Sequence, residues 1–117
     1  MTKRNVIREK SFNFALQIIA LNKKLIREKE FVLSRQLLKS GTSIGANVEE
    51  AGAAQSRRDF IAKMSIASKE ARETKYWIRL LKHSELLQFD DEEFLKEINE
   101  IVNILTAIVK TSQKNTS

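Results

Sequence analysis

The sequence predicts an all-α protein that folds as an antiparallel, up-down-up-down four-helix bundle. The chain of 117 residues contains no proline and only three glycines, whereas β and α/β folds of this size need frequent turns rich in both. Four segments also carry apolar residues at the spacing of amphipathic helices. With 42% apolar and 31% charged residues, the composition is that of a globular protein, and we expect one domain over residues 1–117.

The first helix is expected over residues 10–27. Its apolar residues form two adjacent stripes, the first of Phe14, Ile18, Leu21 and Leu25 and the second of Phe12, Leu16, Ile19 and Ile26. Contact with one neighbouring helix needs less apolar width than this, so the second stripe favours association with another subunit.

The second helix is expected over residues 32–55, with the run Ser40-Gly41-Thr42-Ser43 in its middle. This run could end one helix and start another. We predict one continuous helix, because Leu37, Ile44 and Val48 keep the same helical phase across it. The small side chains would then allow a neighbouring helix to approach closely, at a cost of about 1 kcal/mol for each interior glycine.

The third and fourth helices are expected over residues 57–83 and 91–111. Ser56 followed by Asp59 resembles a capping box at the start of the third helix. Acidic residues around Asp91 suit the positive end of the fourth helix dipole. Leu95, Val102 and Val109 form a second apolar stripe on the fourth helix, which again favours self-association.

The sequence offers little for catalysis. It contains no cysteine and a single histidine, His83, at a predicted helix end. The pairs Glu70/Glu73 and Glu97/Glu100 lack the histidines that di-metal sites in helical bundles use. We therefore expect no enzyme activity, catalytic residue, metal, cofactor or small-molecule substrate. Without an apolar run of membrane-spanning length or a signal peptide, we expect a cytoplasmic protein.

A row of basic residues on the third helix is the first candidate functional feature. Residues 56–83 carry a net charge of +5, within a total of +6. Such a row can follow a nucleic-acid backbone, each contact adding to binding through counterion release. The row consists of Arg72, Lys75, Arg79 and Lys82, and the further candidates Arg57, Arg58 and Lys69 add charge nearby. The alternative is a solvated helix face, balanced by Glu92, Glu93, Glu97 and Glu100 of the fourth helix.

A polar set beside the apolar phase of the second helix is the second feature. Ser43, Asn47 and Glu50 share a face at helical spacing. If buried, they need partners, and Glu73 or a basic residue of the third helix could complete a network. Such networks more often fix register and oligomeric state than perform chemistry, so we predict a structural role.

These segments also carry a family resemblance. The stretch Ser43-Ile44-Gly45-Ala46-Asn47-Val48-Glu49-Glu50 resembles the S-I-x-x-N-[I/V]-x-E-G core of the 23S rRNA intervening-sequence proteins. Residues 56–61 and 69–77 are similar to the third helix of that family, and the match extends over residues 8–110. Ala51 replaces the usual glycine of the motif, and Ala54 and Gln55 stand where basic residues are common.

The resemblance implies a cytoplasmic bacterial protein, encoded in some members within inserts of large-subunit rRNA genes, whose relatives assemble as homopentamers. The family is related in fold to the accessory variability determinant of diversity-generating retroelements, a basic pentameric barrel that binds nucleic acid and a reverse transcriptase. By this analogy, basic residues of the first and third helices would bind RNA or DNA. We therefore expect a non-enzymatic homo-oligomer that binds nucleic acid or, alternatively, a protein-interaction adaptor that binds no nucleic acid.

Overall fold

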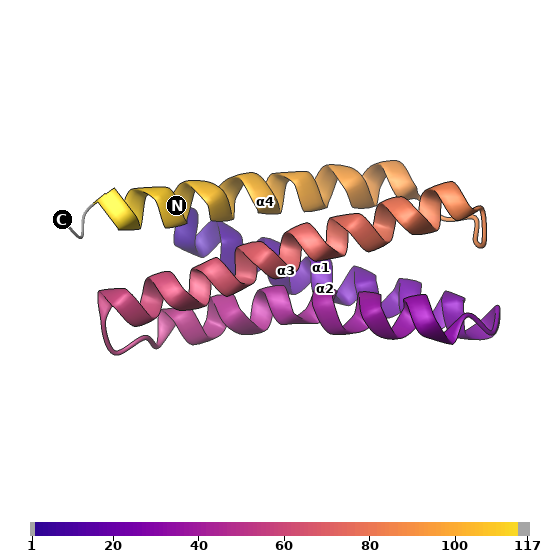
Figure 1. Cartoon of the computed structure of the whole chain (residues 1–117), viewed down its shortest axis with the longest axis horizontal. Coiled ribbons are helices and arrows are strands. Elements are labelled where there is room, and N and C mark those ends of the chain that lie inside the picture. The colour runs from indigo at the N-terminus through magenta and orange to yellow at the C-terminus, as the bar shows by residue number, and fades with distance from the viewer. Residues whose placement is uncertain (1, 115–117) are drawn as a thin grey trace.

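Four α-helices make up most of residues 2–114, the part of the chain that the structure, a computed structural model, describes. They are α1 (Lys3–Arg27), α2 (Phe31–Gly52), α3 (Arg57–Ser84) and α4 (Asp91–Lys114). Each helix runs antiparallel to the one before it and packs against it, and α4 returns to contact α1. The helices form an elongated bundle of 49 × 23 × 22 Å, with the start of α1, the end of α4 and the α2–α3 turn at one end (Figure 1). The predicted all-α bundle is confirmed.

Helix α1 starts seven residues before the predicted Lys10. The Thr2 side chain caps it by accepting a hydrogen bond from the Asn5 backbone N–H at 3.2 Å. Ile7 extends the apolar phase into this turn and is fully buried. The prediction was too short because Ile7 lies among charged residues, and one threonine ahead of them is a weak signal for a cap.

Helix α2 is continuous through the run of small residues at its centre. The Thr42 and Ser43 hydroxyls donate back to the carbonyls of Leu38 and Lys39, both at 2.6 Å, so both polar side chains are satisfied within the helix. Gly41 is buried directly against Ile18 of α1, which confirms the predicted close approach of a neighbouring helix.

Helix α2 ends at Gly52, three residues before the predicted end, because α3 is capped in the turn that follows. The Ser56 hydroxyl accepts from the Asp59 N–H at 3.0 Å, and the Asp59 carboxylate accepts from the Gln55 N–H at 3.4 Å. The first bond is the predicted Ser56 N-cap. The second differs from a strict capping box, because the carboxylate reaches the residue before the cap and not Ser56 itself. At the other end of the chain, α4 continues to Lys114, three residues beyond its predicted end.

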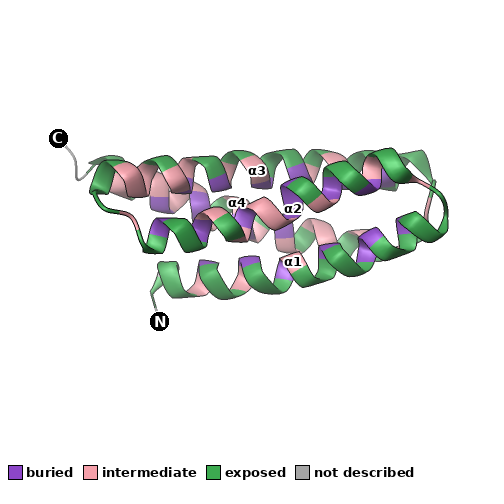
Figure 2. Cartoon of the chain, turned by 90° about the horizontal axis from the view of Figure 1, so that it is seen from below, coloured by how far each residue is buried: buried purple, intermediate pink, exposed green. Residues whose placement is uncertain are grey.

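The core consists of the inward faces of all four helices, as the buried residues in Figure 2 show. The first apolar stripe of α1 lies in it: Phe14 and Leu25, for example, are at most 1% exposed. The second stripes of α1 and α4 differ. Leu95, Val102 and Val109 of α4 are half-buried and pack against the core. The α1 residues remain in solvent, with exposures of 65% for Phe12, 53% for Leu16, 39% for Ile19 and 47% for Ile26. None of the described helices combines the length and apolar character of a membrane span.

A half-buried lysine joins α1 to α4, which share the least extensive of the four helix contacts. Lys10 Nζ lies 2.6 Å from Glu100 Oε2 and 3.2 Å from Glu97 Oε2. The hydrogen bond to Glu100 raises the pKa of Lys10 above 10.5, against an opposing effect of burial. The same bond lowers the pKa of Glu100 below 4.5.

We expect Lys10→Met to lower the free energy of unfolding by about 1 kcal/mol at pH 7. Because the pKa of Lys10 is raised by folding, its contribution is complete below pH 10.5 and is lost as the pH rises through the folded value. Because the pKa of Glu100 is lowered by folding, its contribution is complete above pH 4.5 and is lost as the pH falls through the folded value. The difference between the two proteins should therefore be constant between these limits and shrink on either side, as urea unfolding at pH 3, 7 and 11 would measure.

Arg8→Met is the matched control for Lys10→Met. Arg8 pairs with Glu49 at 3.3 Å, but both side chains are more than half exposed. An exposed pair contributes little, so this variant should unfold almost like the parent protein. If both variants lose the same free energy of unfolding, the bridge from Lys10 to α4 stabilises the protein no more than an exposed ion pair does.

Candidate nucleic-acid interface

The outer face of α3 brings together four of the seven predicted basic residues. Arg58, Lys69, Arg72 and Arg79 are all exposed. At 100° per residue they fall within about 80° of arc around the helix, and they extend over about 31 Å of its length. We call these four residues the α3 basic face.

The other three predicted residues lie elsewhere on α3. Lys75 is half-buried, and Lys82 pairs with Asp91 of α4, Nζ to Oδ1, at 3.5 Å. Arg57 is the first residue of α3 and lines a pocket at the end of the bundle. Arg72 links the two groups, because its Nη2 donates to Thr106 Oγ1 of α4 at 3.0 Å. The predicted row is therefore divided, because Arg72 and Arg79 lie on the outer face whereas Lys75 and Lys82 lie toward α4. Arg57, predicted to add charge nearby, lies at the end of the bundle.

The carboxylates of α4 that were expected to balance the basic row are directed in part to another helix. Glu97 and Glu100 pair with Lys10 of α1. The Lys82–Asp91 pair neutralises one end of the row. The acidic side of α4 thus compensates α1 more than it compensates the α3 basic face.

An exposed aromatic ring lies among the arginines of this face. Tyr76 is 54% exposed and stands one turn after Arg72 and one turn before Arg79. Its ring packs edge-to-face on Trp77, with centroids 5.2 Å apart and an interplanar angle of 69°. Trp77 is half-buried against the core, so it limits the orientations open to the tyrosine ring.

The polar set of α2 makes local contacts in the structure. Ser43 and Asn47 are half-buried, and the Asn47 amide donates to the Ser43 carbonyl at 2.8 Å. Glu50 and Glu73 are exposed. Because Ser40 hydrogen-bonds to Thr74 at 2.9 Å, the antiparallel register places Glu73 level with Gly41, roughly 9 Å along the helix from Asn47. The register thus separates Glu73 from Asn47 and Glu50, two of the three residues that it was expected to join.

Two further features lie outside the residues predicted from the sequence. The Lys10 bridge could have been found from heptad spacing, which places Glu97 and Glu100 on the edge of α4 beside α1. Arg4, which enters the pocket with Arg57, lies in the turn that the short prediction of α1 omitted. His83 is exposed, and within residues 2–114 no three or more histidine, aspartate or glutamate side chains gather in a way that could hold a metal ion.

The fold and this surface define a small all-α bundle protein with one markedly basic helix face. The family model described as 23S rRNA-intervening sequence protein matches residues 3–107, and the chain belongs to that family. A crystal structure of a protein with unknown function from the S23 ribosomal protein family of Bacteroides thetaiotaomicron is similar, with 49% sequence identity and a TM-score of 0.89. The similarity covers 93% of this chain and 99% of that one. No curated protein matches the chain.

Proposed function

We propose that this protein is a non-enzymatic, self-associating four-helix bundle of the cytoplasm that binds RNA or DNA through the α3 basic face. The observation that carries the proposal is the separation of charge on the bundle. Glu97 and Glu100 are held by Lys10 on the α1 side, which leaves Arg58, Lys69, Arg72 and Arg79 exposed on α3.

The proposed binding is electrostatic, with one aromatic contribution. Each guanidinium or ammonium group that meets a phosphate releases condensed counterions, so affinity falls steeply with salt. Tyr76 adds a π-face between Arg72 and Arg79 on which an unpaired base can stack. The membership in a family named for 23S rRNA makes rRNA the first nucleic acid to test.

Self-association is proposed through the exposed stripe of α1, formed by Phe12, Leu16, Ile19 and Ile26. Contiguous exposed apolar surface marks an interaction site. Successive members are separated by three, four or seven residues, which is the spacing with which one helix packs along another. A second copy of the chain presents the same complementary stripe, and the family resemblance favours a closed ring of five.

Reversing two charges of the α3 basic face tests the binding proposal. We expect Arg72→Glu/Arg79→Glu to weaken binding of a 23S rRNA fragment by roughly 10- to 100-fold at 0.1 M salt, and to reduce the salt slope by about two. Filter binding over a salt series measures both effects.

The matched control is Arg35→Glu/Lys39→Glu, which makes the same charge change at exposed positions of α2. It should bind nearly as well as the parent protein. If both variants lose the same affinity, the loss comes from the change in net charge and not from the α3 basic face. Binding that is absent or insensitive to salt would overturn the proposal.

A further inference from the structure

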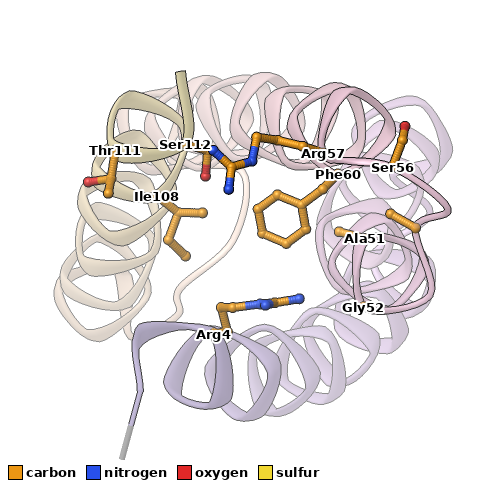
Figure 3. Close-up of a pocket in the computed structure, with 10 residues that line it drawn as sticks. Arg4, Ala51, Gly52, Ser56, Arg57, Phe60, Ile108, Thr111 and Ser112 are labelled. Carbon is orange, nitrogen blue, oxygen red and sulfur yellow. The ribbon is translucent and has the colours of Figure 1, made fainter. Parts of the chain in front are cut away.

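A pocket opens at the end of the bundle where α1 starts and α4 ends. Its volume is about 470 Å³, within the range of small-molecule sites. The start of α1, the α2–α3 turn and the last turns of α4 surround it (Figure 3).

Two arginines from different helices enter this pocket. The Arg4 guanidinium carbon lies 4.6 Å from the centroid of the Phe60 ring, a cation–π contact that restrains the side chain. Arg57 enters from the first turn of α3. Figure 3 shows both guanidinium groups directed into the opening, with the Phe60 ring between them in this view.

The remaining walls are of two kinds. Hydroxyl groups come from Ser56, Thr111 and Ser112, and apolar surface comes chiefly from Phe60 and Ile108. The Ser56 oxygen accepts from the Asp59 N–H as the α3 cap, which leaves its own hydrogen available to donate. The pocket therefore combines cationic and hydroxyl donors with an apolar, partly aromatic wall.

We propose that this pocket binds a phosphate monoester carried on a planar ring, the chemistry of a nucleoside 5′-monophosphate. Together the two guanidinium groups offset the nearly double negative charge of a phosphate monoester, and the forked donors of either group suit its terminal oxygens. A carboxylate offers one charge and two oxygens, so it would use fewer of these donors. The planar ring lies along Phe60 and Ile108. The site is separate from the α3 basic face, and the inference does not depend on the proposed function.

Titration with three probes tests whether both halves of the ligand are recognised. We expect adenosine 5′-monophosphate to shift the backbone amide resonances of residues 51–60 and 108–112 in ¹H–¹⁵N NMR spectra. Inorganic phosphate and adenosine should each bind at least tenfold more weakly, because each fills only part of the site. Equal binding of inorganic phosphate, or no binding of the nucleotide, would overturn the inference.

Substitutions of the two arginines locate the site. Arg4→Gln and Arg57→Gln should each lower the affinity for adenosine 5′-monophosphate by about tenfold, since each removes a charge-assisted contact. Arg35→Gln on the outer side of α2 is the control and should have no effect. Unchanged affinity in both pocket variants would rule out this pocket.

The phosphate monoester could belong to a free nucleotide or to the 5′ end of a strand. Fluorescence anisotropy of two RNA oligonucleotides that differ only in a 5′-phosphate or a 5′-hydroxyl separates these sources. A preference for the phosphorylated strand, abolished by Arg57→Gln, identifies a strand end. Equal affinity for both strands, together with binding of the mononucleotide, identifies a free nucleotide.

Discussion

If the chain self-associates as proposed, placing glutamate at both Phe12 and Ile19 is expected to leave only monomers of 13.5 kDa. Both side chains lie on the exposed stripe of α1, 65% and 39% accessible in the single chain. In an assembly they would be desolvated against another copy, where an unpaired carboxylate is strongly unfavourable. In the isolated bundle the same substitutions face water and should leave the helical content unchanged. Light scattering coupled to size exclusion measures the mass directly.

The matched control for this pair is Asn13→Glu/Ala20→Glu. These positions have the same seven-residue separation and are also exposed, but each lies about 100° around α1 from Phe12 or Ile19. The control should keep the mass of the parent protein. If both variants dissociate, another surface of α1 forms the interface.

A parent protein that is already monomeric would overturn the self-association proposal. The exposed stripe would then be open to a different protein, as the adaptor alternative requires. That alternative predicts a partner whose capture survives nuclease treatment and is lost with Phe12→Glu/Ile19→Glu.

The core could be predicted from the sequence because its signal is periodic. Phe14, Ile18 and Leu25 repeat at helical spacing, and burying that face is the main stabilising contribution available to each helix. The Ser56 cap of α3 was predictable for a similar reason, since its hydrogen bond to the Asp59 N–H is local.

The arrangement of the candidate sites could not be predicted from apolar periodicity, because it depends on how the helices are placed against one another. Predicting the partners of the α2 polar set required the register between α2 and α3. The Ser40–Thr74 hydrogen bond reveals that register, and the sequence does not. Predicting how the basic row is divided required knowing which edge of α3 faces α4. Predicting the pocket required knowing that the start of α1, the α2–α3 turn and the end of α4 meet at one end of the bundle.

Adding one methyl group at Gly41 is expected to destabilise the protein by about 1–2 kcal/mol, although alanine is the better helix former. A Cβ atom there would lie 2.8 Å from Ile18 Cγ1 and 2.9 Å from Ile18 Cγ2. Ile18 is fully buried, and its branched side chain has one strongly preferred rotamer in a helix, so it has little freedom to turn aside. Overpacking of this kind costs about 1–3 kcal/mol, and the gain of about 1 kcal/mol in helix propensity offsets only part of it.

Gly52→Ala supplies the control, because nothing lies within 4 Å of a Cβ atom at that position. It should raise the free energy of unfolding by about 0.5 kcal/mol through propensity alone. Urea unfolding of both variants at one fixed protein concentration gives the comparison, because the proposed self-association would stabilise each protein by mass action.

The double variant Gly41→Ala/Ile18→Ala attributes the effect to one contact. Ile18→Ala alone leaves a cavity beside Gly41 and should cost about 2–5 kcal/mol. In the Gly41→Ala protein the same truncation also relieves the overlap, so its cost should fall by at least about 0.5 kcal/mol. Additive losses, or a Gly41→Ala protein as stable as its parent, would mean that the two helices can separate freely at this point. A non-additive result would show that the contact between Ile18 and Gly41 sets how closely α1 and α2 pack at this point.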